Sequence, residues 1–433
     1  MNESRNRWLL LFEGILLVCV ITPLLLFPNI NTTLTLAAIA LLAGLWSLGW
    51  LLARRPLLPP SPLSPALLLW GLAVGVGIIV TADPNLTFPK ATGLLLGYAY
   101  WRYIVIALQT RQLINLGVIF FLLTGLGMMF VGTISTNWRV KVPLLNNLLS
   151  LLPSQLIQLP GGSLEGTHAN ELGGTIIIFL PLLLVVLTGW QVIRKTPLLI
   201  ISLFGVAISA SLLLVLTQSR SAWIGGVGGF SSLLFFWFIF LPPSRLRMVG
   251  RIFLGLVVVV IILLLVRTDW NQIIQFWEAP PRDTAVGTLT TFNFRRQLWR
   301  SAIEIIEDTP FTGTGLGAFR QVVPRLYPIS ASNYDDVAHA HNIFIQVAVD
   351  TGLPGLIAYL AILVSSTALC YQVARQGGED KRLVLGLLAG LVGLHFFGLT
   401  DTIAPGAKPG LLLWLSLGLI VAIYQLNYGS RKI

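Results

Sequence analysis

The sequence predicts an all-α protein, a polytopic transmembrane bundle of about 12 helices with a large, partly helical loop on its outer face. Apolar residues make up 55% of the 433 residues, charged residues make up only 10%, and the mean hydropathy is +0.83. This composition excludes a soluble globular domain. Apolar runs recur from one end of the chain to the other, and each can cross about 30 Å of hydrocarbon as a helix.

Hydropathy places the predicted spans along the whole chain, which is therefore expected to form one integral membrane domain over residues 1–433. The spans are residues 8–27, 32–52, 64–81, 91–108, 113–132, 171–190, 197–217, 221–241, 249–267, 342–374, 382–400 and 409–427. The first lacks a small-residue cleavage pattern, so it is read as a retained helix. In the run over 342–374, Gly352 and Pro354 are expected to separate a short surface helix from a true span.

Basic residues predict the orientation of the bundle. Alternate short connections carry Arg and Lys, as at Arg54, Arg111, Arg194 and Arg375, and that side is expected to be cytoplasmic together with both termini. The net charge of +11 is then explained by topology rather than by nucleic-acid binding. The outer face receives two long segments, residues 133–170 and 268–340.

The two outer segments carry different signals. Residues 143–158 have leucines at helical spacing and no charge, which predicts a helix lying in the membrane interface. Such a helix would guide a lipid, or would simply cover the bundle. Residues 268–340 are rich in arginine, which long translocated loops tolerate. This cationic loop predicts an anionic ligand.

Arginines in two places are candidate ligands for that anion. Arg295, Arg296 and Arg300 open an amphipathic helix that precedes the glycine-rich turn GTGLG, and a guanidinium fork can hold diphosphate oxygens bidentately. The turn lacks the preceding strand and following lysine of a nucleotide site, so it is read as a turn only. Arg220, between two apolar runs, is either a snorkelling anchor or part of a ligand pocket.

Two histidines stand where the long loop returns to the membrane. An imidazole titrates near neutrality and can accept a hydroxyl proton, so His339 and His341 are candidate bases as well as ordinary structural histidines. No further ligand stands at a metal-binding interval, and no metal site is predicted. Asp350 is expected to orient this region or to cap the TGLPG turn. Asp401 and His395 either line the same cavity or stabilise it.

Four pieces in order carry a family resemblance. They are GTHANELGGTIIIFLPL, the SRSAW turn, Arg295 four residues before Trp299 leading into TPFTGTGLGAF, and HNIFIQVAVDTGLPGL. Over roughly residues 160–403 the chain resembles the O-antigen ligase and polymerase superfamily of bacterial membrane glycosyltransferases. The resemblance implies a twelve-helix protein of the inner (plasma) membrane with a periplasmic active site.

The resemblance also implies a reaction. Such proteins transfer a glycan from undecaprenyl diphosphate to a lipid A core or to another carrier-linked glycan, with no cofactor, metal or nucleic acid. By match to motif, Arg220 and Arg295 correspond to the functional arginines and His341 to the functional histidine. The residues expected to contact substrate are Arg296, Arg300, His339, Asn170, Asp350 and Asp401. Asp350 departs from the family pattern, in which many relatives have Glu.

The resulting hypothesis is direct, inverting transfer in which arginines hold the diphosphate while His341 accepts the acceptor's proton. Ligase and polymerase remain equally open, because acceptor recognition sits in variable loops. A secondary transporter of a small anion such as bicarbonate is an alternative, but its site would lie near the midplane. The main intramembrane charges, Glu13 and Arg102, are instead expected to snorkel toward cytoplasmic ends. A non-catalytic scaffold for envelope assembly is the third possibility.

Overall fold

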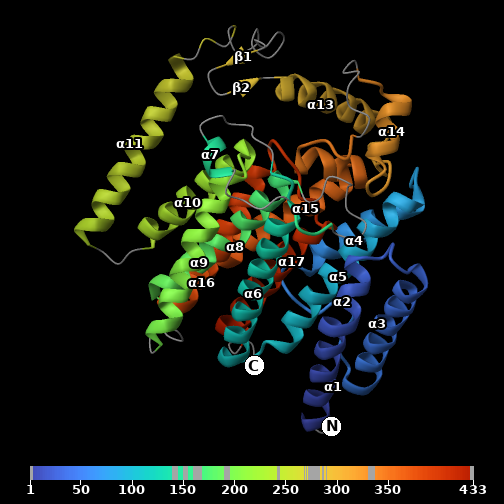
Figure 1. The fold of residues 1–433 in the computed structure, drawn as a ribbon. Coiled ribbons are helices and arrows are strands. Elements are labelled where there is room, and N and C mark those ends of the chain that lie inside the picture. Colours follow the sequence, from blue (N-terminus) through green and yellow to red (C-terminus); the bar gives the residue numbers. More distant parts are fainter. Residues whose placement is uncertain are drawn as a thin grey trace.

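The computed structural model describes most of the chain. The described residues are 3–138, 145–149, 155–158, 168–189, 196–240, 244–267, 290–329 and 337–429, with 269, 271, 283–284 and 287–288. They form a bundle of long helices with an outer layer of shorter elements at one end (Figure 1). Helix α1 begins and helix α17 ends at the opposite end of the bundle, as the predicted common side of the termini requires.

Helices occupy every position at which a span is predicted. The first is continuous through α1 (Glu3–Leu16), a π-helical turn (Leu17–Ile21) and α2 (Thr22–Leu26). The next are α3 (Thr32–Ala53), α4 (Ser64–Ile79), α5 (Pro84–Ala107), α6 (Arg111–Ser135), α8 (Ala169–Gly189) and α9 (Pro197–Leu216). The last are α10 (Arg220–Ile239), α11 (Arg245–Arg267), α15 (Ile343–Gln376), α16 (Gly378–Phe397) and α17 (Leu411–Tyr428).

This pattern confirms the predicted class, a polytopic helical membrane protein. Within the described ranges, 8 helical segments are long and apolar enough to cross a membrane. The helix α4 is apolar but shorter, and α5, α11 and α16 fall outside that criterion. The count of about twelve crossings therefore stays a prediction.

The centre of the bundle is built on close approaches between α8, α10 and α16. A Cβ on Gly390 would lie 2.1 Å from the Ile178 carbonyl oxygen, and one on Gly225 would lie 2.7 Å from that of Gly393. Only residues without side chains permit such backbone contact, which is how helices pack tightly in a membrane. The contact holds the start of α10 beside the end of α16. There Thr400 donates to Ser221 at 2.9 Å.

The long helix α15 is divided as the sequence predicts. Gly352 has a φ of 72°, a left-handed conformation that ends the regular helix inside Ile343–Gln376. A Cβ there would lie 2.6 Å from the carbonyl carbon of Phe311, so the kink also seats the turn that follows α13. The short first part of α15 thus belongs to the outer end of the bundle.

The outer layer has an apolar core of its own. It contains α13 (Thr290–Asp308), α14 (Phe319–Leu326) and a two-residue antiparallel pair, β1 (Asp283–Thr284) and β2 (Gly287–Thr288). Buried apolar residues from α13 and α14 meet Ala340 and Val349 at the start of α15. Burial of this cluster fixes α13 over the outer end of the bundle (Figure 1). The prediction of a partly helical loop is confirmed.

The predicted interfacial helix over residues 143–158 is wrong at residues 155–158. The helix α7 spans only Asn146–Leu149, and residues 155–158 are not helical. The backbone N–H groups of Leu156 and Ile157 donate to the Ile134 carbonyl oxygen at 2.8 and 3.3 Å, so this stretch pairs with the end of α6 instead. The remainder of the predicted helix lies outside the described residues.

The expectation that Glu13 and Arg102 snorkel is also wrong. Arg102 is 0% exposed, and its guanidinium pairs with the Glu13 carboxylate at 2.8 Å. Arg55 reaches the other Glu13 oxygen at 3.2 Å, and the Trp46 ring lies 5.2 Å from the Arg102 guanidinium carbon. This buried cluster of one carboxylate and two guanidinium groups connects α1, the end of α3 and α5. Each charge is almost fully shielded from solvent and depends on the others for neutralisation.

Removing the carboxylate from this cluster is expected to destabilise the bundle. Glu13→Leu leaves two buried arginines without a counter-charge, which costs about 3–5 kcal/mol. Thermal unfolding of the purified protein in detergent should show a lowered midpoint. Ser47→Ala is the control, because its hydroxyl is exposed and bonds only to the Ala43 carbonyl oxygen on α3. Equal midpoints for the two variants would contradict the assigned role of Glu13.

Candidate active site

The centre of the candidate site is the carboxylate of Asp401, which follows α16 and is 3% exposed. His341 Nδ1 lies 3.1 Å from its Oδ1, and the Thr402 backbone N–H donates to the same oxygen at 2.9 Å. Asn170 Nδ2 donates to Oδ2 at 2.7 Å, and Arg295 Nη2 lies 3.5 Å from it. One acid therefore gathers groups from α8, α13 and the segment before α15.

These partners keep Asp401 ionised. Burial alone raises the pKa of Asp401, but the hydrogen bond from His341 and the charges of His341, His339 and Arg295 together hold that pKa well below its usual range. An ionised carboxylate accepts hydrogen bonds and cannot donate them. His341 Nδ1 must therefore carry the hydrogen, and Nε2 is the nitrogen that can accept a proton.

The backbone sets the direction of the His341 ring. His341 has a φ of 49°, a left-handed conformation that is uncommon for a residue with a side chain. The next residue, Asn342, caps α15 by accepting from the backbone N–H groups of Phe344 and Ile345 at 3.0 and 3.1 Å. The turn into the helix thus points His341 back toward Asp401.

His339 stands against His341 as a neutral partner. The two ring centroids are 4.3 Å apart, and the backbone N–H of His341 donates to His339 Nδ1 at 3.2 Å. Burial, followed by the charges of His341, Lys90 and Arg295, lowers the pKa of His339 to about 3. With Nδ1 as an acceptor, neutral His339 carries its hydrogen on Nε2.

Arg295 and Trp299 reach this segment from the same face of α13. They stand four residues apart, one helical turn, and Trp299 Nε1 donates to the Ala340 carbonyl oxygen at 2.8 Å. Burial lowers the pKa of Arg295, Asp401 raises it, and the charge of Arg220 lowers it again. Arg220, exposed at the first position of α10, therefore stands within electrostatic reach of Arg295.

The other predicted contacts are placed differently. Arg296 and Arg300 lie on α13 but about 100° and 140° around the helix from Arg295, and Arg300 is exposed. His395 donates from Nδ1 to the Leu391 carbonyl oxygen at 2.6 Å and accepts from Tyr359 at 2.8 Å, which gives it a structural role between α15 and α16. The substrate roles of Arg296 and Arg300 stay predictions.

Asp350 faces the glycine-rich turn rather than Asp401. Its Oδ1 accepts the Gly317 N–H at 3.1 Å and Gln346 Nε2 at 2.9 Å. In the GTGLG turn, Gly313, Gly315 and Gly317 have φ values of 65°, 97° and 71°, so the interpretation as a turn is confirmed. Orienting this region is one of the two roles predicted for Asp350.

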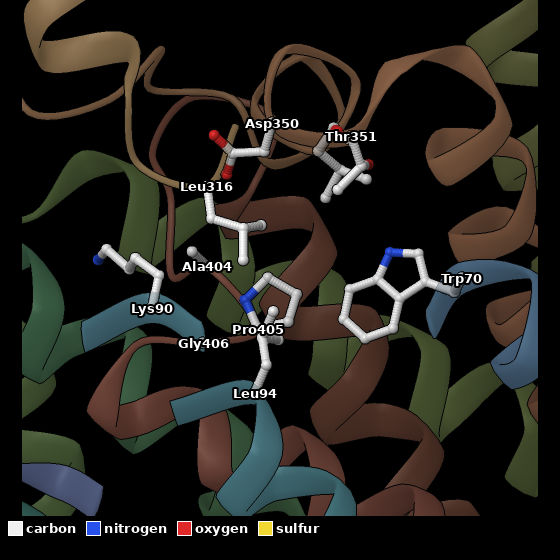
Figure 2. A pocket seen from close by; sticks show the side chains of 10 residues that line it. Trp70, Lys90, Leu94, Leu316, Asp350, Thr351, Ala404, Pro405 and Gly406 are labelled. Carbon is white, nitrogen blue, oxygen red and sulfur yellow. Dashed lines mark hydrogen bonds between the residues drawn. The ribbon is translucent and has the colours of Figure 1, made fainter. Parts of the chain in front are cut away.

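A small pocket lies beside this turn. Figure 2 shows Asp350, Leu316 and Lys90 around it, with Pro405 below and Trp70 on the far side. Its cavity volume is about 20 Å³, enough for a water molecule and too small for a sugar. The pocket joins α5, α15 and the segment after Asp401, so it borders the histidine site without enclosing a substrate.

Three side chains of the site have the donor set of a metal site. Ligand atoms of His339, His341 and Asp401 lie within 4.8 Å of one another. Sequence spacing gives no sign of this set, because Asp401 follows His341 by 60 residues. Arg295, however, already places a fixed positive charge at the same carboxylate, which favours a hydrogen-bonded His341–Asp401 pair over a bound cation.

Sequence reasoning missed Gln346, which connects both halves of this region. It is 3% exposed, accepts the Ala340 N–H at 2.8 Å through Oε1 and donates to Asp350. No motif marks it, and a glutamine on an apolar helix carries no signal of its own. Its position one turn before Asp350 is the single clue in the sequence.

Fold and site together define a polytopic helical membrane protein with a histidine–carboxylate pair set among arginines at one end of its bundle. Residues 204–360 match the family model described as O-antigen ligase. The exopolysaccharide production protein ExoQ of Rhizobium meliloti (strain 1021) is 30% identical over 145 residues, which cover 31% of this chain and 32% of that protein. Over these residues the chain is therefore similar to proteins of the O-antigen ligase and polymerase family.

The matched segment divides the site. It contains Arg220, Arg295, His339, His341 and Asp350, and it ends before Asp401. The alignment with ExoQ spans about a third of that relative's length. The geometry around Asp401 is therefore evidence that the family match does not supply.

Proposed function

We propose that this protein is a glycosyltransferase of the O-antigen ligase or polymerase type, moving a glycan from undecaprenyl diphosphate to a hydroxyl of an acceptor sugar. The observation that carries the proposal is the His341–Asp401 pair beside Arg295. Asp401 binds Nδ1 of His341, so Nε2 is left as the proton acceptor. The arginines supply the positive charge that would bind a diphosphate.

The transfer is a single displacement. The acceptor oxygen attacks the anomeric carbon while its proton passes to His341 Nε2, and the bond from that carbon to the diphosphate oxygen breaks. The electron pair leaves with the diphosphate, whose growing charge Arg220 and Arg295 stabilise. The ionised Asp401 stabilises the imidazolium that forms. One displacement at one carbon inverts the configuration there.

The proposed setting is the inner membrane, with the site on the periplasmic face and both termini in the cytoplasm. The predicted orientation from basic connections supports it, as does the position of the outer layer at the end of the bundle opposite the start of α1 (Figure 1). The acceptor is either a lipid A core or a second carrier-linked glycan. Mass spectrometry of envelope glycans from a deletion strain separates these: uncapped lipid A core indicates ligation, and single-repeat caps indicate polymerisation.

The test of the proposed function uses the full-length protein reconstituted in liposomes with a radiolabelled undecaprenyl-diphosphate-linked glycan. Wild-type protein should transfer label to an added acceptor and release undecaprenyl diphosphate in equal amount. Counterflow of a labelled small anion such as bicarbonate in the same liposomes, without any transferred product, would instead support transport. Absence of both results would leave the scaffold interpretation.

Replacing the guanidinium of Arg295 should weaken donor binding. In Arg295→Lys the charge remains, but the planar fork that can hold two diphosphate oxygens is lost, so donor KM is expected to rise about tenfold or more. Steady-state transfer at varied donor concentration measures it. Arg325→Lys on α14 is the matched control, because Arg325 is exposed. An unchanged KM for Arg295→Lys would remove the bidentate contact.

A further inference from the structure

We propose that Gln346 is a positioning residue, whose side-chain amide helps to place both histidines by holding the backbone N–H of Ala340, the residue between them. This inference rests on the proposed function for its kinetic consequence. Its geometric part stands on the structure alone. Gln346 acts through Ala340, whose backbone N–H it accepts.

Both backbone polar groups of Ala340 are hydrogen-bonded to side chains. Its N–H donates to Gln346 Oε1 at 2.8 Å, and its carbonyl oxygen accepts from Trp299 Nε1 at 2.8 Å. Ala340 is 0% exposed, so water cannot replace either bond. The first bond fixes the peptide plane between His339 and Ala340, and the second fixes the plane between Ala340 and His341, so together they set the backbone from which both side chains start.

The orientation of the Gln346 amide is itself determined. Asp350 Oδ1 already accepts the Gly317 N–H at 3.1 Å, and when ionised it has only acceptor capacity. The Ala340 N–H can only donate, so the Gln346 oxygen must face it, and this turns the NH₂ group toward Asp350 Oδ1, at 2.9 Å. The hydrogen bonds therefore run in one direction from the glycine turn to the histidine segment.

This anchoring accounts for the unusual backbone of His341. A φ of 49° persists only where neighbouring contacts outweigh the intrinsic preference for other conformations. Gln346 lies one turn into α15, where Asn342 caps the helix and the Ile343 N–H donates to the Gly398 carbonyl oxygen at 2.7 Å. The histidine segment is thereby tied both to α15 and to the segment that carries Asp401.

The decisive variants change the charge at the contact between Gln346 and Asp350. Gln346→Glu keeps an oxygen for the Ala340 N–H but sets a second carboxylate against Asp350, and kcat is expected to fall about a hundredfold as His341 shifts. Adding Asp350→Asn removes the repulsion between two carboxylates, because only one negative charge then remains at this contact, while the new amide oxygen can still accept the Gly317 N–H. The double variant is expected to recover kcat at least about tenfold over Gln346→Glu.

A second measurement requires no turnover. Hydrogen exchange of the Ala340 amide, followed by mass spectrometry of peptides spanning residues 337–345, should accelerate at least about tenfold in Gln346→Leu. Exchange beyond the Gly352 kink should not change. The control is Ser366→Ala, a buried polar residue of α15 whose hydroxyl bonds to the Ile362 carbonyl oxygen. It should alter neither the exchange of Ala340 nor kcat.

The outcomes separate the two proposals. Unchanged Ala340 exchange in Gln346→Leu, or a double variant no more active than Gln346→Glu, overturns the positioning role. If Gln346→Leu unfolds, the double variant decides, because it keeps an oxygen for the Ala340 N–H and introduces no second negative charge. Absence of transfer by the wild-type protein contradicts the proposed function and leaves the exchange result as the test of Gln346.

Discussion

His341→Gln is expected to reduce turnover by about 10²–10⁴-fold while leaving the affinity for the lipid-linked donor nearly unchanged. Glutamine preserves a hydrogen-bond donor toward Asp401 and much of the side-chain volume. It cannot accept a proton as a base near neutral pH. The loss should therefore fall on kcat, with donor KM close to that of the wild-type protein.

Single-turnover transfer with saturating donor is the measurement for His341. The matched variant is His339→Gln, which changes the neighbouring ring and leaves the Asp401 contact in place. Because its low pKa makes His339 a weak proton acceptor, it is not the base, and its replacement should cost less than that of His341. Equal losses for the two variants would mean that the histidine pair acts as a structural unit.

Asp401→Asn should have the second largest effect. The carboxylate selects the His341 tautomer with hydrogen on Nδ1, and an amide in its place can instead donate to Nδ1. That exchange moves the hydrogen to Nε2 and blocks the proton acceptor. A loss of about 10²–10⁴-fold in kcat follows, since the nearby arginines also lose the negative charge that partly offsets them.

The pH profile distinguishes this tautomer effect from general damage. Ionised Asp401 stabilises the imidazolium that forms during transfer, so its removal should displace the profile along the pH axis as well as lower it. Thr402→Ala is the neighbouring control. A profile with the wild-type midpoint and only a reduced height would show that Asp401 does not interact with the base.

Local sequence patterns predicted most of the fold because membrane insertion depends on local hydropathy. Each predicted span coincides with a helix, and the kink at Gly352 follows from a residue that tolerates left-handed backbone. The stretch around Leu156 failed for a non-local reason. Its leucine spacing suits a helix, but its N–H groups pair with Ile134 at the end of α6.

The site shows the same division between local and distant information. Arg295 and His341 were found through residues that stand in recognisable local order. The buried state of Arg102 was missed, because its partner Glu13 is 89 residues away. Gln346 was missed because its two hydrogen bonds gain meaning only when Ala340 and Asp350 are placed on either side of it. Contacts between residues that are distant in the sequence produce no local sequence pattern by which they could be predicted.

The ion cluster of α1, α3 and α5 has a consequence for biosynthesis. Glu13 leaves the ribosome first, and its two cationic partners follow 42 and 89 residues later. An unneutralised charge within a nascent span costs about 2.5–3.5 kcal/mol on the insertion scale. The first helix is therefore expected to stay beside the translocon until Arg55 and Arg102 emerge, because these two residues neutralise Glu13.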